Sequence, residues 1–204
     1  MEMGKQSIKR NHRQPFMKTK LQLLTAMLLV VGVLTGCQTP RATIPTGDAA
    51  LTIRNNCCSL LHQLLQKQKD VSLLRFIKRE QSDVKELVNK IAINSATGAK
   101  LLEALAKDDP RINLDDIRLP PGEVATRAAI AATKKKELLD QTGDKFELTL
   151  LLTQTEALSY AWHLAKVAGE NESQPDPARA LAGLSEDMRK LYYEAFALLL
   201  SKTE

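Results

Sequence analysis

Residues 144–169 read DKFELTLLLTQTEALSYAWHLAKVAG, and their apolar side chains recur every three or four residues. Two neighbouring stripes result, made up of Phe146, Leu150, Ala157, Ala161 and Leu164 and of Leu151, Leu158, Trp162 and Ala165. This spacing places apolar residues on one broad side of an α-helix. The stretch therefore predicts a long helix that is buried along most of its length.

The rest of the chain from residue 49 onward shows the same helical period, and the period-two alternation of strands is absent. Pro110 and Pro120-Pro121-Gly122 bound a loop between two such stretches. The predicted helices span residues 49–68, 70–79, 82–107, 122–141, 144–169, 177–182 and 185–201. Connections this short join antiparallel neighbours, so we expect an all-α, antiparallel bundle of four or more helices.

Two local patterns predict where helices begin. Asp144 is followed three residues later by Glu147, which fits a capping box at the start of the 144–169 helix. Asp176 precedes Pro177, which fits an N-cap followed by a proline at the first helical position.

The net charge of +5 comes from the N-terminus alone. Residues 1–36 hold six of the 29 Lys and Arg residues but only one of the 24 Asp and Glu residues, which leaves 23 of each beyond. A nucleic-acid-binding domain needs a lasting cationic surface. We therefore expect no nucleic-acid partner.

Residues 17–36 have the layout of a signal peptide. Met-Lys-Thr-Lys at 17–20 precedes an apolar run from Leu21 to Leu34 that only Gln22 and Thr25 interrupt. The run has about 14 residues, fewer than the roughly 20 that cross a membrane as a helix. Residues 1–36 are therefore predicted to be a signal peptide, with Met17 as an alternative start.

The run ends in Leu34-Thr35-Gly36-Cys37, which resembles the lipobox of bacterial lipoproteins that signal peptidase II processes. The resemblance covers about a tenth of the chain. It implies that cleavage exposes Cys37, whose thiol carries diacylglycerol and whose amine is often acylated too, for example by palmitate. Two or three acyl chains give stable membrane anchoring.

The residues after Cys37 bear on location and on domain organisation. In lipoproteins of enteric-type cells, an Asp directly after the lipidated cysteine retains the protein at the inner membrane. This chain has Gln38 at that position, so the resemblance implies the outer membrane, facing the periplasm. The inner membrane and the cell surface are the alternatives. Residues 37–48 contain two prolines and a glycine and predict a flexible linker. Residues 49–204 form one helical domain by length.

Cys57, Cys58 and His62 form the cluster best suited to bind metal or to carry out redox chemistry. They supply fewer ligands than the four of a structural zinc site. Both cysteines continue apolar stripes, so packing in the core is the favoured interpretation. A non-local or intermolecular disulfide and a metal or redox site are the alternatives.

A polar stripe on the 144–169 helix offers a second candidate site, made up of Thr149, Thr153, Glu156, Tyr160 and His163. In a cleft, Glu156 could orient His163 as a general base, with Tyr160 as a donor. A solvated or structural polar side of a bundle helix is the favoured interpretation.

Known catalytic motifs are missing from the sequence. It has no Glu-x-x-His of di-iron bundles, no Gly-x-Ser-x-Gly, no Ser-x-x-Lys and no phosphate-binding glycine loop. We therefore expect no enzymatic activity and no cofactor.

The expected function is that of a lipid-anchored scaffold or accessory subunit, which binds membrane lipid through acylated Cys37 and an envelope protein through its domain. Exposed Leu198, Leu199 and Leu200 would be one docking patch. The alternative is a ligand- or metal-binding bundle with a pocket between helices.

Overall fold

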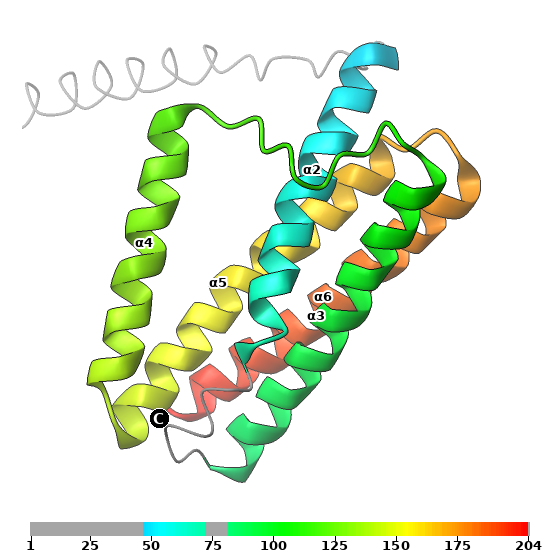
Figure 1. The fold of residues 1–204 in the computed structure, drawn as a ribbon. Helices are drawn as coiled ribbons and strands as arrows, with labels where there is room; N and C mark the ends of the chain where they lie inside the picture. The colour runs from blue at the N-terminus through cyan, green and yellow to red at the C-terminus, as the bar shows by residue number, and fades with distance from the viewer. Residues whose placement is uncertain (1–46, 72–80, 204) are drawn as a thin grey trace, which may run out of the picture. The chain divides into compact units, whose positions relative to one another are not determined.

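The computed structural model describes residues 47–71 and 81–203, and within them the fold is all helical (Figure 1). The helices are α2 (Gly47–Gln68), α3 (Ser82–Asp108), α4 (Pro121–Asp140), α5 (Gly143–Glu170) and α6 (Pro175–Ser201). The all-α prediction is confirmed. The signal peptide, Cys37 and residues 72–79 of the predicted 70–79 helix lie outside the described residues.

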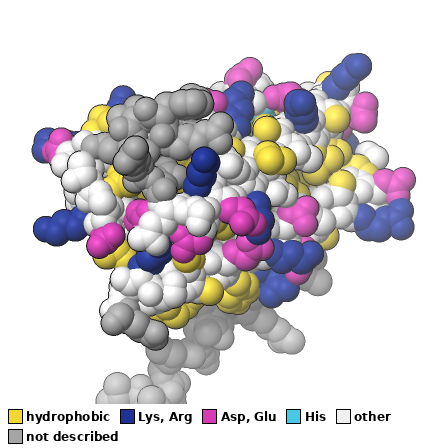
Figure 2. Space-filling view, turned by 90° about the horizontal axis from the view of Figure 1, so that it is seen from below, with side chains coloured by type: hydrophobic (Ala, Val, Ile, Leu, Met, Phe, Trp, Pro, Cys, Tyr) yellow, Lys and Arg dark blue, Asp and Glu magenta, His cyan; other side chains and the backbone are white. Residues whose placement is uncertain are grey.

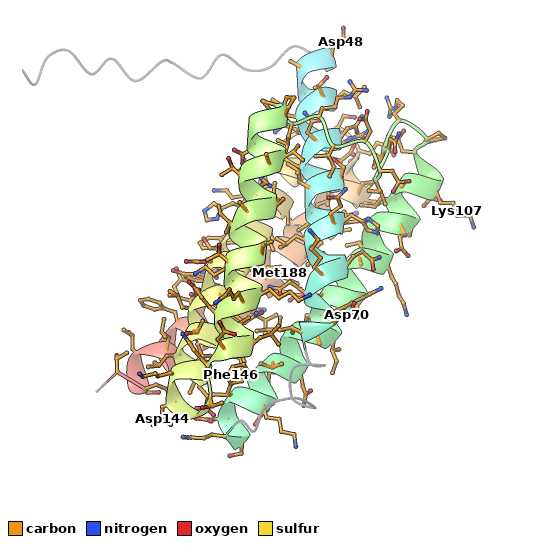
Figure 3. All side chains as sticks on the ribbon, turned by 60° about the vertical axis from the view of Figure 1, so that its left-hand side comes forward. Asp48, Asp70, Lys107, Asp144, Phe146 and Met188 are labelled. Carbon is orange, nitrogen blue, oxygen red and sulfur yellow. The ribbon has the colours of Figure 1, made fainter. Side chains whose placement is uncertain are left out.

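Four of the helices form an antiparallel bundle. Helix α2 packs against α3 and α5, and α6 packs against α3 and, most extensively, against α5. In Figure 3, Asp48 at the start of α2 and Asp144 at the start of α5 lie at opposite ends of the molecule. Helix α4 contacts this bundle through α5 and stands to one side of it (Figure 1).

The predicted apolar stripes of α5 form the middle of the core. Phe146, Leu150, Leu151, Leu158 and Ala165 are almost fully buried, and leucines of α2 and α6 pack around them. At about 25 cal/mol per Å² of buried apolar surface, such a core provides the main driving force for folding.

A close approach between helices is centred on Gly98 of α3. A Cβ atom there would lie 2.7 Å from Leu184 of α6 and 2.9 Å from Leu65 of α2. The missing side chain therefore lets three helices come together at this level of the bundle.

The C-terminal helix is continuous, whereas the sequence predicts a break between residues 182 and 185. Gly183 lies inside α6 with nothing packed against it, while Leu181 and Leu184 on either side are buried. Burial of these two leucines outweighs the roughly 1 kcal/mol that a helical glycine costs. The predicted break is wrong for this reason.

Both predicted helix starts are also wrong. Helix α6 begins at Pro175, before Asp176, and Gln174 at its N-cap makes no side-chain capping bond. Helix α5 begins at Gly143, whose φ of +59° suits a residue without a Cβ atom. Glu147 is buried instead of capping α5, and it accepts hydrogen bonds from the Gln81 backbone N–H and from Lys202 Nζ, the latter at 3.0 Å.

None of the described helices is long and apolar enough to cross a membrane. Figure 2 shows the molecule from below, with Lys and Arg side chains interspersed among Asp and Glu side chains. The face in this view therefore presents no continuous field of one sign.

Candidate functional site

The two cysteines of α2 are separate free thiols. Cys58 is fully buried in the core, and Cys57 is half-buried beside it. Burial raises the pKa of the Cys58 thiol to about 12 and also raises the pKa of Cys57. Because the thiolate is the reactive form, both side chains are poor nucleophiles and metal ligands at neutral pH.

His62 faces α3 instead of joining the cysteines in a site. Its Nε2 atom lies 3.1 Å from Glu103 Oε1, and Gln66 donates to the same carboxylate oxygen at 2.9 Å. Across residues 47–71 and 81–203, no three His, Cys, Asp or Glu side chains are grouped so that they could hold a metal ion. The cysteines pack as the core interpretation expects.

A buried ion cluster near the cysteines was missed by the sequence analysis. Arg54 is 2% exposed, and its guanidinium lies 2.6 Å from Glu172 and 2.9 Å from Asp109. Hydrogen bonds from the Arg111 side chain, and then from Arg54, hold the pKa of Asp109 well below its ordinary range. The cluster joins α2 to the ends of α3 and α5, which makes it a structural clamp.

Helix α4 contacts part of the polar stripe of α5. The Arg127 guanidinium donates to the Tyr160 hydroxyl at 2.7 Å, and Lys134 Nζ lies 3.4 Å from Glu156. Further along, Thr149 donates to Gln141 at the end of α4. The stripe is therefore a polar contact between helices and is not a purely solvated surface.

The proposed general-base group is not assembled. His163 is exposed and turned toward its own helix, with Nδ1 2.7 Å from the Ser159 carbonyl, and its ring stacks near Trp162. Glu156 is paired with Lys134 and Tyr160 with Arg127, so Glu156 has no part in orienting His163. This geometry offers no base held by a carboxylate.

An apolar groove of about 390 Å³ lies between α2, α4 and α5. Its lining side chains come from α2, from the segment before α4, from α4 itself and from α5: Leu60, Gln63, Leu64, Lys67, Ile117, Leu119, Val124, Arg127, Ala128, Ala131 and Tyr160. Of the predicted site residues, Tyr160 alone reaches this groove. The sequence does not show it, because the lining residues are up to 100 positions apart in the chain.

Aromatic side chains gather on the outer surface of α5 and α6. Trp162, Tyr192, Tyr193 and Phe196 form a cluster with ring centroids 5.2–6.3 Å apart between neighbours. Tyr193 is 51% exposed and Phe196 is 40% exposed. We refer to these four residues as the aromatic face.

The predicted C-terminal leucine patch is mostly used in packing. Leu198 and Leu199 are partly buried against the core, and Leu200 is half exposed. Leu200 follows Phe196 by four residues on α6, so it extends the aromatic face by one turn.

Comparison of the chain with protein families, with curated proteins and with solved structures gives no match. The function must therefore be argued from these surfaces.

Proposed function

We propose that this protein is a lipid-anchored accessory subunit of a bacterial envelope assembly, which acts by binding another protein. The motif at residues 34–37 supports an anchor on Cys37, and Gln38 supports a place at the outer membrane, facing the periplasm. The helical domain supports a binding role, because its side chains form two open apolar surfaces.

The aromatic face carries this proposal. Four of the six aromatic residues in the described parts of the chain lie on it, whereas the fully buried core contains Phe146. Tyr and Trp are enriched at protein interfaces because they bury a large area with little loss of side-chain entropy. Exposed aromatic side chains that cluster on one surface are therefore better suited to a partner than to solvent.

Two of the charges that border the aromatic face, those of Arg189 and Glu194, are already paired. Arg189 forms a bidentate pair with Glu186 and lies over the Tyr193 ring, and Glu194 pairs with Lys90 of α3. A rim of matched charges gives little long-range attraction for a charged ligand. The partner that fits is a protein with an apolar face, bound with weak dependence on salt.

Cross-linking in intact envelopes, followed by mass spectrometry, tests the proposal. We expect the Tyr193→Ala/Phe196→Ala double variant to lose a cross-linked partner that the unaltered chain retains at high salt. Ile93→Ala is the matched control, because Ile93 is an exposed apolar residue on α3. A partner that survives the double variant, or is lost equally with the control, would refute a docking role for the aromatic face.

The anchor is tested separately with Cys37→Ser. We expect the variant to lose incorporation of labelled palmitate and to leave the outer-membrane fraction, since the acyl chains supply the binding energy. Unchanged membrane association would show that Cys37 is not the anchor.

The groove between α2, α4 and α5 favours a second function, the binding of a small molecule. Its volume lies within the roughly 300–1,000 Å³ of ligand sites.

A further inference from the structure

The groove is an apolar interface that residues 47–71 and 81–203 leave unfilled. Helix α4 has 20 residues, yet only Leu138 near its C-terminal end is buried. Val124, Ala128 and Ala131 line the groove but remain exposed, and Val124 is 49% exposed. These apolar side chains face neighbouring helices but stay in contact with water. A ligand that covered them would therefore gain binding free energy from the burial of apolar surface.

The opposite wall of the groove is also apolar. Leu60 and Leu64 of α2 pack against the core on one side and line the groove on the other. Ile117 and Leu119 extend this surface just before α4 begins. The lining residues span about two turns of α2 (60–67) and about two turns of α4 (124–131), so the groove suits an elongated ligand.

The polar side chains of the lining are donors or carry positive charge. Lys67 is exposed and has no ion-pair partner among the described residues, and no carboxylate lines the groove. Tyr160 accepts a hydrogen bond from Arg127, so its own hydroxyl proton is free to be donated. Arg127 also pairs with Glu123 at 2.7 Å, which leaves Lys67 as the main uncompensated charge.

These features together define one class of ligand. An inorganic anion would leave the apolar walls exposed to water. A cationic amphiphile would be repelled by the positive charges of Lys67 and Arg127. We propose that the groove binds an anionic amphiphile with a single acyl chain, with the chain between α2 and α4 and the head group near Lys67 and Tyr160. A free fatty acid and an anionic lysophospholipid share this chemistry. The inference rests on the second function proposed above, whose ligand class it names, and it does not depend on the aromatic face.

Photolabelling tests the proposal on the full-length chain in phosphatidylcholine vesicles. The probes are photoreactive tetradecanoate, an anionic lysophospholipid with the same acyl group, and the corresponding neutral alcohol. We expect both anionic probes to label peptides that contain residues 60–67 and 117–131. We expect labelling of these peptides by the alcohol to be about threefold weaker, because an exposed charge contributes modestly. The stronger of the two anionic probes identifies the source of the acyl chain.

Two alanines of α4 provide a matched pair of variants. Ala128 lines the groove, whereas Ala129 is also exposed but does not line it. We expect Ala128→Trp to lower labelling about tenfold by filling the groove, and Ala129→Trp to leave it unchanged. Lys67→Gln should remove the preference for the anionic probes, with Lys69→Gln as its control.

Three outcomes would overturn the proposal: labelling of the helical domain (residues 49–204) only outside the groove, labelling of the groove unaffected by Ala128→Trp, or equal labelling of the groove by the alcohol and the acids. A second measurement, hydrogen exchange, detects ligand binding without a photolabel, and unchanged protection of α5 and α6 in each variant shows that the variant is folded. Hydrogen exchange of α4 should slow when tetradecanoate is added to the unaltered chain and to Ala129→Trp, but not to Ala128→Trp. Ala128→Trp should keep the partner cross-linked at the aromatic face, so failure of one proposal is distinguishable from failure of the other.

Discussion

Replacing Arg54 with methionine removes a buried cation from the carboxylates of Glu172 and Asp109. Arg54 is 2% exposed and lies 2.6 Å from Glu172, whose side chain is 3% exposed, and 2.9 Å from Asp109. Methionine preserves much of the apolar stem that packs in the bundle. The substitution therefore tests the charge more than the packing.

The expected loss of stability is large. Removing one partner of a buried ion pair costs about 3–5 kcal/mol, because the remaining charge is desolvated and uncompensated. Asp109 keeps its hydrogen bonds from Arg111, so Glu172 accounts for most of this loss. Small domains have a free energy of unfolding of about 5–15 kcal/mol in total, so Arg54→Met should leave the domain marginally stable.

Urea unfolding of the full-length chain provides the measurement, with fluorescence of Trp162, the only tryptophan, as the signal. The control is Arg118→Met, which removes an exposed pair with Asp116 and should change stability by less than about 0.5 kcal/mol. Adding Glu172→Gln to Arg54→Met should restore at least about 1 kcal/mol of the free energy of unfolding, because it removes the uncompensated buried charge. A cost below about 1 kcal/mol for Arg54→Met would refute the clamp.

The same cluster gives stability an acid dependence. The Arg111 side chain, and then Arg54, hold the pKa of Asp109 below its ordinary value of 3.8. The resulting stabilisation is fully present above the unfolded pKa and is lost as the pH falls through the lower, folded pKa. The urea midpoint of the unaltered chain should therefore decline below about pH 4, and this decline should be smaller in Arg54→Met. An equal decline in both chains would exclude a contribution of Arg54 to the Asp109 pKa.

Three further predictions concern other parts of the bundle. Lys202→Met leaves Glu147 buried without its cation and should lower the free energy of unfolding by about 3 kcal/mol in urea titrations, and a loss below about 1 kcal/mol would contradict it. Gly98→Val should destabilise the domain by about 1–3 kcal/mol, because the new side chain clashes with leucines of α2 and α6. Gly183→Ala should stabilise it by about 0.5–1 kcal/mol, since nothing lies within 4 Å of the new Cβ. Thermal unfolding should show shifts of the melting temperature in opposite directions for the two variants. Cys58 should react with iodoacetamide only when the domain unfolds, and modification of the native protein at the rate of a free thiol would contradict its burial.

The helices could be predicted because each carries its own periodic signal. The stripes of α5 and the Pro-Pro-Gly break before α4 are local patterns, and the structure places helices accordingly. The break near Gly183 was predicted wrongly, because a local signal for a helix end was outweighed by burial of Leu181 and Leu184. Local sequence signals thus predict helices well, except where packing between distant residues favours a different helix boundary.

The candidate surfaces could be predicted only in part. Arg54 lies on the same stripe as Cys58, Leu61 and Leu65, and an arginine on an apolar stripe is a signal for a buried ion cluster that the sequence analysis overlooked. Its partners could not be named, because Glu172 lies 118 residues away. The polar stripe of α5 was recognised, but nothing in its sequence shows that α4 contacts part of it.

The sequence by itself determined the helical class of the domain and the buried side of α5, since side chains within one helix are placed by its fixed period. Only the tertiary structure decided that α4 stays outside the four-helix core, that a groove opens beneath it and that four aromatic rings meet on α5 and α6. The physical reason is that periodicity reports which face of a helix is apolar. Which other helix covers that face, and how completely, depends on packing among residues far apart in the chain.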